Sequence, residues 1–287
     1  MKRTTRIIHQ LVRASKMDSV LVLAGIHLRI LNKLVPLSNE YSVGEYRNVM
    51  RDGVLYRLDI SDYVQWSVYA NQPEHSWQYA GNDQRQMKVI LDIGANVGQF
   101  SLKVAHILKD RVNDFQVHAF EPSPFIFSAL QTNLSLNNSL KQNVYLHPLA
   151  LGNTEGQTYF SYSPSNSGGG RVSTEQTGSL VTITTLDNWF KKESLSRLDF
   201  IKIDVEGLEP EVLLGGREVI KKFKPDLYLE ITDEWFRNRG YSSGWLFDLL
   251  ESWGYNWWAD NNGKLESAEN SAEAKKKQFN ILARSKH

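Results

Sequence analysis

The chain has 287 residues, of which 41% are hydrophobic and 23% are charged, enough to bury the core of one large globular domain or somewhat more. It contains no cysteine, which excludes disulfide frameworks, thiolate metal centres and cysteine nucleophiles and fits a cytoplasmic protein. A net charge of +1 argues against binding through a strongly basic field, so we expect no nucleic-acid partner.

The first 35 residues carry a local excess of positive charge, with seven lysines and arginines against Asp18. The apolar run Val20–Ile26 is too short for a membrane span and lacks the cleavage site of a signal peptide. Two interpretations of residues 1–35 stay open: a helix packed on the main domain, and a basic helix docking peripherally on an anionic membrane or an acidic partner. Apolar residues at helical spacing before Pro36 predict this helix: Leu21, Leu23, Leu28, Ile30, Leu31 and Leu34.

Residues 37–87 show no clear period beyond a short strand at Val54–Leu58. From Lys88 onward, strand patterns alternate with helix patterns over short connections. This alternation predicts parallel strands joined by right-handed crossovers, an α/β sheet. The expected elements are Val89–Ile93, Val97–Leu108, Phe115–Phe120, Phe125–Leu136 and Val144–Leu146. We therefore predict a helical N-terminal extension and cap over residues 1–84 and a catalytic domain over residues 85–287.

Two alternating, β-branched stretches interrupt the rhythm at Gln157–Tyr162 and Leu180–Leu186. The segment between them contains three consecutive glycines and has the composition of a mobile loop. We expect an inserted β-hairpin whose tip supplies Gly169 and Arg171 to a substrate, with a plain surface hairpin as the alternative. The α/β rhythm then resumes with Phe200–Ile203, Glu209–Phe223, Leu227–Ile231, Trp245–Trp253, Tyr255–Ala259 and Phe279–Ala283.

The most specific motif follows the strand Val89–Ile93, where Asp92, Gly94, Asn96 and Gly98 form a turn that opens a helix. A dinucleotide fingerprint requires glycine at position 96. Asp92 would also repel a pyrophosphate, whereas a carboxylate suits the ammonium and sulfonium of S-adenosylmethionine. We therefore predict S-adenosyl-L-methionine as the cofactor. The alternatives are a nicotinamide dehydrogenase and a glycine turn used only for packing.

A second acid, Glu121, ends the next strand, where a carboxylate accepts both hydrogen bonds of a ribose diol. Pro122 bends the chain after it. We expect Ser123 and the strand-end residue Ala150 to contact the adenine edge. Phe125 either stacks on adenine or belongs to the core.

These motifs, together with Leu149–Gly152, Thr185–Asp187, Phe200–Gly207 and Leu229–Ile231, resemble the FkbM family of S-adenosylmethionine-dependent methyltransferases over about residues 85–260. The resemblance implies a Rossmann-like class I methyltransferase fold. Its mostly parallel seven-stranded sheet would have six parallel strands, one antiparallel strand near the C-terminus and helices on both faces. It also implies O-methylation of a hydroxyl on a sugar, a glycan or a secondary metabolite.

Carboxylates stand where the chemistry requires a base, because a sugar hydroxyl is very weakly acidic. Asp204 and Glu206 follow the strand Phe200–Ile203, and Glu230 ends the next strand along the chain. We expect Asp204 as first choice for the base, Glu206 as second, and Glu230 to orient the acceptor for in-line transfer. Helix capping and a buried ion pair are the alternatives. No histidine stands at ligand spacing from these acids, so we assign no metal site.

Other functions stay open beside O-methylation. N-methylation and C-methylation need less help from a base, and a non-catalytic S-adenosylmethionine-binding partner module would carry the same glycine turn. His75 is a further candidate for contact with the acceptor, because histidine can act as a base near neutral pH. An ordinary surface histidine is the alternative. No oligomeric state is predicted.

Overall fold

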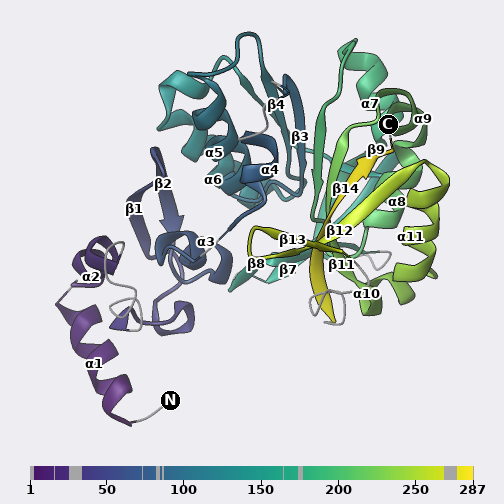
Figure 1. Ribbon diagram of the computed structural model, residues 1–287. Helices are drawn as coiled ribbons and strands as arrows, with labels where there is room; N and C mark the ends of the chain where they lie inside the picture. The colour runs from purple at the N-terminus through teal and green to yellow at the C-terminus, as the bar shows by residue number, and fades with distance from the viewer. Residues whose placement is uncertain are drawn as a thin grey trace. The chain divides into compact units, whose positions relative to one another are not determined.

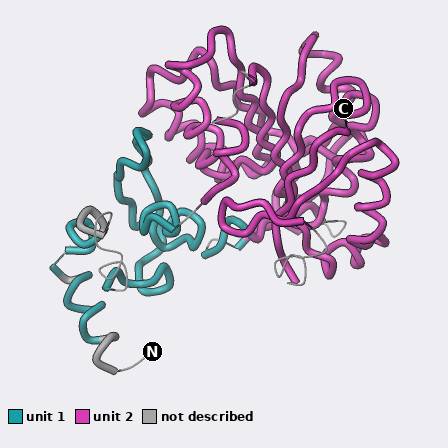
Figure 2. The backbone as a smooth tube through the Cα atoms, viewed as in Figure 1, with its two compact units in different colours: residues 1–73, 163–168 teal, residues 74–162, 169–287 magenta. Residues whose placement is uncertain are grey.

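The computed structural model describes residues 3–15, 17–25, 34–72, 74–81, 85, 87–163, 165–173, 177–267 and 277–286. The chain forms two compact units, one of residues 1–73 and 163–168 and the other of residues 74–162 and 169–287 (Figure 2). Part of the helix expected before Pro36, residues 26–33, lies outside the described residues.

The first unit combines helices with a β-hairpin. Asp52 and Gly53 both have positive φ, which is the conformation that a two-residue hairpin turn requires. Buried Asp18 accepts hydrogen bonds from Arg47 and from the Tyr69 hydroxyl, which ties a helix to the hairpin. Within the described ranges, no helix is long and apolar enough to cross a bilayer. The elements are α1 (Arg3–Ala14), α2 (Asp18–Gly25), η2 (Ser38–Glu40), β1 (Tyr46–Arg51), β2 (Val54–Asp59) and α3 (Tyr63–Tyr69).

The second unit is built on a sheet of order β13-β12-β14-β11-β10-β3-β4-β5 (Figure 1). Its strands are β3 (Val89–Ile93), β4 (Gln116–Phe120), β5 (Val144–His147), β10 (Phe200–Ile203), β11 (Asp226–Thr232), β12 (Tyr255–Asn261), β13 (Lys264–Ser267) and β14 (Gln278–Ser285). β3, β4, β5, β10 and β11 pair in parallel, and β14 runs antiparallel between β11 and β12. This confirms the predicted Rossmann-like class I fold.

The edge strand β13 adds an eighth strand that the sequence analysis did not predict. It pairs antiparallel with β12 across a turn at Asn262 and Gly263, both of which have positive φ. An Asn-Gly pair is a strong signal for a two-residue hairpin, and it was present in the sequence.

Helices cover both faces of the sheet, as Figure 1 shows. Leu91 and Ile93 of β3 join a buried core with Trp189, Leu213 and Leu250 from helices of one face. On the opposite face, helix α5 packs against β4. The helices are α4 (Trp77–Gly81), α5 (Gln99–Leu108), α6 (Pro124–Ser135), η3 (Asn138–Leu140), α7 (Leu186–Glu193), α8 (Glu209–Gly215), α9 (Arg217–Phe223), α10 (Asp233–Arg237) and α11 (Ser243–Ser252).

The helix predicted over Glu209–Phe223 is divided into α8 and α9 at Gly216. The preceding Gly215 lies so close to the backbone that a Cβ there would be 1.9 Å from the Gly152 carbonyl oxygen. Such an approach is available only to glycine, and glycine also weakens a helix. Gly215 and Gly216 therefore interrupt the helix, and they allow it to pack closely on the strand that ends at Gly152.

The insertion forms a separate sheet of order β6-β9-β7-β8, with strands β6 (Ala150–Gly152), β7 (Gly156–Ser163), β8 (Asn166–Ser173) and β9 (Ser179–Thr185). β7 and β9 are the two predicted strands, and they pair antiparallel. The glycine-rich segment expected as a loop is strand β8. Its first part is anchored within the first unit, where Ser167 donates to the buried Asp62 from its backbone N–H and, at 2.9 Å, from its hydroxyl.

Candidate active site

The turn after β3 has left-handed backbone at Gly94, Asn96 and Gly98, with φ of 87°, 48° and 90°. Gly94 approaches the loop after β10 so closely that a Cβ would lie 1.9 Å from the Asp204 carbonyl oxygen. A Cβ at Gly98 would lie 2.6 Å from Leu130 of α6. Packing against backbone as well as φ therefore requires glycine at position 94, positive φ favours glycine at position 98, and asparagine tolerates the left-handed conformation between them.

The backbone donors of this turn are already used. Five successive N–H groups, from Gly94 to Gly98, donate within the protein. The first two donate to the Phe120 carbonyl oxygen at 3.0 and 2.9 Å, the third donates to Glu121 at 3.0 Å, and the last two donate to acceptors of the turn at 2.9 Å. A turn that binds phosphate offers such donors to the ligand. The geometry therefore fits a cofactor that makes no phosphate contact and disfavours a pyrophosphate.

Glu121 joins the turn after β3 to the turn after β4. Its Oε2 accepts from the Asn96 N–H at 3.0 Å and its Oε1 from the Ser123 N–H at 2.9 Å. The carboxylate is only 4% exposed, and burial raises its pKa to about 7 in spite of these two bonds. Each carboxylate oxygen keeps a second lone pair, so the group can accept two more hydrogen bonds from a diol.

The residues expected around adenine differ in their exposure. Ser123 is buried and caps α6, and Ala150 is buried at the start of β6. Pro122 is partly buried. Phe125 is 51% exposed and stacks on Tyr162 with ring centroids 6.0 Å apart, which contradicts its interpretation as a core residue.

A buried ion cluster lies beneath the turn. Asp92 is 0% exposed, accepts a hydrogen bond from the Ser101 hydroxyl and has Oδ1 3.8 Å from Nζ of Lys202. Lys202 also donates to Asp204 Oδ2 at 2.9 Å. Burial by itself would lower the pKa of Lys202, but the charges of Asp204 and Asp92 raise that pKa above its usual range. Burial raises the pKa of Asp92.

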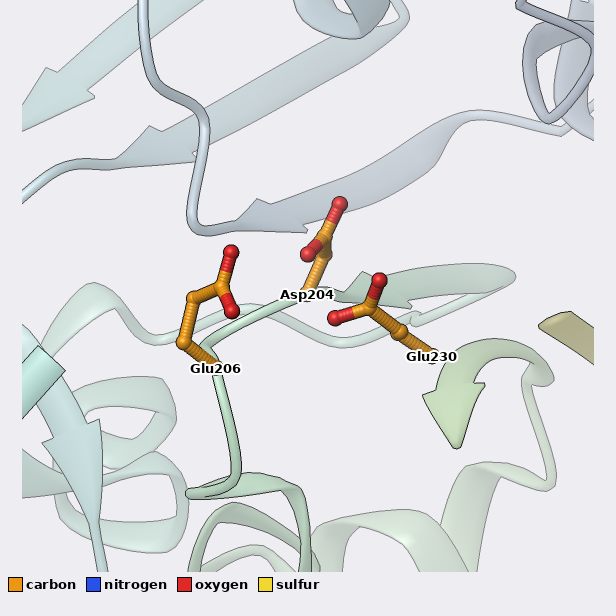
Figure 3. Close-up of side chains that lie close together, drawn as sticks. All are labelled: Asp204, Glu206 and Glu230. Atoms are coloured by element: carbon orange, nitrogen blue, oxygen red, sulfur yellow. The ribbon is translucent and has the colours of Figure 1, made fainter. Parts of the chain in front are cut away.

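Asp204, Glu206 and Glu230 converge at the carboxyl ends of β10 and β11, with one carboxylate oxygen from each within 4.8 Å of the others (Figure 3). We call these residues the acid trio. Burial, reinforced by the charge of Asp204, raises the pKa of Glu206 to about 8 and that of Glu230 to about 9. Three carboxylates this close can share a proton or hold a divalent cation.

Helix α8 has Leu208 at its N-cap and no side-chain capping bond from the described residues. Glu209 accepts hydrogen bonds from the N–H groups of Val205 and Gly207, at 2.8 and 3.0 Å. Asp204 and Glu206 are therefore not occupied by the capping role that the sequence left open for them. Glu230 accepts a bond from the Gln278 amide, and its Oε2 is buried without a hydrogen-bond partner in the described part of the chain.

Three more residues were predicted to contact the acceptor: Arg171, Gly169 and His75. Arg171 in β8 is exposed, and its charge lowers the pKa of Glu206, which places it within electrostatic reach of the acid trio. Gly169 lies two residues before it on the same strand. His75 is partly buried beside Glu74, whose charge acts on Asp92 and Lys202.

Two neighbouring residues were already indicated by the sequence. Glu74 belongs to the segment with His75 and Trp77 that is a candidate for acceptor contact, and Lys202 precedes Asp204 on the same strand face, where it can pair with a carboxylate. The structure confirms the pairing of Lys202 with Asp204 at 2.9 Å. Only the fold brings Glu74 within electrostatic reach of Asp92 and Lys202.

A known protein family matches the part of the chain that contains this site. The sequence profile of the Methyltransferase FkbM domain matches residues 92–256, which are 165 of the 287 residues. The chain belongs to the FkbM methyltransferase family. This finding confirms the resemblance carried by the motifs, and the matched residues include the turn after β3, Glu121 and the acid trio.

Individual relatives of this FkbM-family chain match it in part. It is 30% identical to Methyltransferase sdnD of Sordaria araneosa over 161 residues, which are 45% of this chain and 60% of that protein. It is 25% identical to the 2-O-methyltransferase NoeI of Sinorhizobium fredii over 184 residues, covering 57% of this chain and 71% of that protein. The crystal structure of Methyltransferase FkbM from Methylobacillus flagellatus aligns with a TM-score of 0.47 and 15% identity, over 78% of this chain and 52% of that one.

Proposed function

We propose that the chain is an S-adenosylmethionine-dependent methyltransferase that transfers a methyl group to a hydroxyl of a glycan or another small molecule. The observation that carries the proposal is the close approach of Gly94 to the Asp204 carbonyl oxygen, 1.9 Å from an ideal Cβ. This approach sets the turn after β3 directly against the loop that bears Asp204 and Glu206, two members of the acid trio. A methyl donor held at the turn would thus lie beside an acceptor held at the acids.

The cofactor side of the site would use Glu121 for the ribose diol and Ser123 and Ala150 at the adenine edge, past the bend at Pro122. S-adenosylmethionine, when bound, supplies the methyl group on a positively charged sulfur. Asp92 is buried against Ser101 and Lys202, so it would support the turn from beneath, and only the part of its charge that Lys202 does not offset would favour a cation. Gly94, Asn96 and Gly98 would shape the turn.

The acceptor side would use the acid trio. In-line transfer requires that the hydroxyl lose its proton as the new carbon–oxygen bond forms, and a carboxylate oxygen within hydrogen-bond reach can accept that proton. Asp204 is our first choice for this base, with Glu206 as second and Glu230 orienting the acceptor. Arg171, Gly169 and His75 would contact the rest of the acceptor.

O-methylation is favoured by two observations. The acid trio offers proton acceptors that N-methylation and C-methylation need less, and the relative NoeI is named a 2-O-methyltransferase. The chain spans about 60% of the length of sdnD, so its complete activity and acceptor belong to this proposal. Peripheral docking of residues 1–35 on a membrane or an acidic partner remains a separate proposal.

Calorimetric titration with S-adenosylhomocysteine and, separately, NADH tests the cofactor. We expect binding of S-adenosylhomocysteine alone, weakened roughly tenfold to a hundredfold by Glu121→Ala, because hydrogen bonds to a charged group contribute about 1.5–3 kcal/mol. Glu193→Ala, an exposed acid at the end of α7, is the matched control and should bind as the wild type does. Binding of NADH alone would overturn the assignment.

Transfer of a labelled methyl group to a panel of glycan and metabolite hydroxyls tests the reaction. We expect Asp204→Asn to abolish transfer while S-adenosylhomocysteine still binds. If the wild type binds the cofactor product but methylates no hydroxyl, and Asp204→Asn does not change the methylated products of the host cell, the chain is a non-catalytic binding module.

A further inference from the structure

Lys202 is a buried cation placed between two carboxylates of different strands. The parallel register sets Lys202 of β10 opposite Asp92 of β3. Its Nζ lies 3.8 Å from Asp92 Oδ1 and 2.9 Å from Asp204 Oδ2, and the residue is only 9% exposed. A third carboxylate, that of Glu74 in the segment before α4, also acts on it.

The buried negative charge of Asp92 requires the compensating positive charge of Lys202. Asp92 Oδ2 accepts the Ser101 hydroxyl, but Oδ1 is buried and has no hydrogen-bond partner within the residues that the structure describes. An uncompensated buried carboxylate is strongly unfavourable. The Lys202 ammonium is therefore what offsets the charge of Asp92 in the interior.

The same ammonium sets the geometry of Asp204. The bond of 2.9 Å is the closest contact of Lys202 with a carboxylate, and Asp204 is the member of the acid trio nearest to the cofactor turn by backbone. Glu206 and Glu230 interact with Asp204 electrostatically. One side chain thus touches both the carboxylate beneath the turn and the acid trio.

We propose that Lys202 is a positioning residue that links the two halves of the site: it offsets the charge of Asp92 on the cofactor side and fixes the carboxylate of Asp204 on the acceptor side. This inference deepens the proposed methyltransferase function and rests on it. Loss of the ammonium would weaken cofactor binding, would leave the buried carboxylate of Asp92 without a compensating charge, and would release the side chain of Asp204 from its 2.9 Å bond.

The absence of cysteine allows a direct test. Lys202→Cys supplies a single thiol, which can be alkylated with 2-bromoethylamine in denaturant to restore an ammonium at nearly the lysine position after refolding. An opposite charge nearby shifts a carboxyl pKa by about 1–3 units. We therefore expect Lys202→Cys to bind S-adenosylhomocysteine roughly tenfold or more weakly and to gain infrared absorption of protonated carboxyl groups near neutral pH.

Restoration of the charge distinguishes positioning from packing. Aminoethylation of Lys202→Cys should recover both the affinity and the wild-type infrared spectrum. Lys221→Cys, at an exposed lysine of α9, receives the same treatment as the matched control and should match the wild type throughout. Unchanged affinity and spectrum in Lys202→Cys, or no recovery after aminoethylation when the control is intact, would overturn the proposal.

A second variant tests the proposal if Lys202→Cys does not refold after alkylation. Lys202→Met combined with Asp92→Asn removes the ammonium together with the buried carboxylate that it offsets. The carboxylate of Asp204 is then the group whose infrared band is measured. The ionised-carboxylate band of Asp204, identified as the band that Asp204→Asn removes, should shift in this variant because the carboxylate no longer accepts the ammonium bond; an unshifted band would refute the link to Asp204. A wild type that does not bind S-adenosylhomocysteine would refute the methyltransferase function, while the infrared result would still decide the link.

Discussion

Replacing Gly94 by alanine tests whether contact between the turn after β3 and the Asp204 loop organises the site. Gly94 has φ of +87°, and an added Cβ would lie 1.9 Å from the Asp204 carbonyl oxygen and 2.9 Å from its carbon. Left-handed backbone costs an alanine about 1–2 kcal/mol. Because real Cβ atoms essentially never approach below 3.0 Å, the loop must also move by about an ångström.

A second glycine allows the cost of left-handed backbone to be measured separately from the cost of displacing the loop. Gly240 has φ of +83°, almost the same as Gly94, but no atom lies within 4 Å of its ideal Cβ. Gly240→Ala therefore measures the backbone strain alone, about 1–2 kcal/mol. Displacement of well-packed backbone adds about 1–3 kcal/mol, so Gly94→Ala should lose about 2–5 kcal/mol in total.

Urea denaturation of both variants gives the free energies of unfolding, and calorimetry gives the affinity for S-adenosylhomocysteine. We expect Gly94→Ala to lose more stability than Gly240→Ala and to bind S-adenosylhomocysteine more weakly, whereas Gly240→Ala should bind as the wild type does. Equal loss of stability in the two variants, with unchanged affinity in both, would refute the argument that this contact sets the site.

Three further predictions concern buried groups. Burial lowers the pKa of His118 to about 3 and that of His147 to about 4, so protonation of these histidines in the unfolded chain removes stability as pH drops below 6.5, and urea denaturation should show the wild type losing stability over this range relative to His118→Gln combined with His147→Gln. Burial raises the pKa of Glu230 from 4.5 to about 9, so the wild type should lose stability as pH rises through this range and Glu230→Gln should lose less. Trp189 Nε1 has no hydrogen-bond partner among the described residues, so Trp189→Phe should cost well below the roughly 3–5 kcal/mol of Trp189→Ala.

Each of these predictions has a contradicting result. Parallel acidic profiles for the wild type and the double histidine variant would contradict the histidine prediction. Parallel alkaline profiles for the wild type and Glu230→Gln would contradict the raised pKa of that carboxyl. Equal destabilisation by Trp189→Phe and Trp189→Ala would show that the indole N–H matters more than the volume of the ring.

Local pattern was sufficient for most of the sheet and for the acid trio. Strand and helix periods along the chain predicted the parallel order, because short crossovers permit few other topologies. Asp204, Glu206 and Glu230 could be expected to converge, since the carboxyl ends of neighbouring parallel strands meet at one edge. The motif at Asp92 and Gly94 also lies at a strand end, where the strand opens into a helix. Its resemblance to the FkbM family could be recognised from the local sequence.

Contacts between distant segments decided the rest. The glycine-rich strand β8 is anchored where Ser167 meets Asp62, 105 residues away, and no local composition reports such a partner. Of the five N–H groups from Gly94 to Gly98, three donate to Phe120 and Glu121 at the end of the next strand.

The order of the elements, the family and the positions of the candidate acids could be predicted from the amino-acid sequence, because they follow from short-range periods and from residues fixed at strand ends. Which charges face one another depends on the folded structure. The contact of Lys202 with Asp92, and the electrostatic effect of Glu74 on both, arise from strand register and packing. Burial raises the pKa values of Glu121, Glu206 and Glu230. Electrostatic interactions depend on distance and desolvation in three dimensions, and neither is encoded in the spacing of residues along a chain.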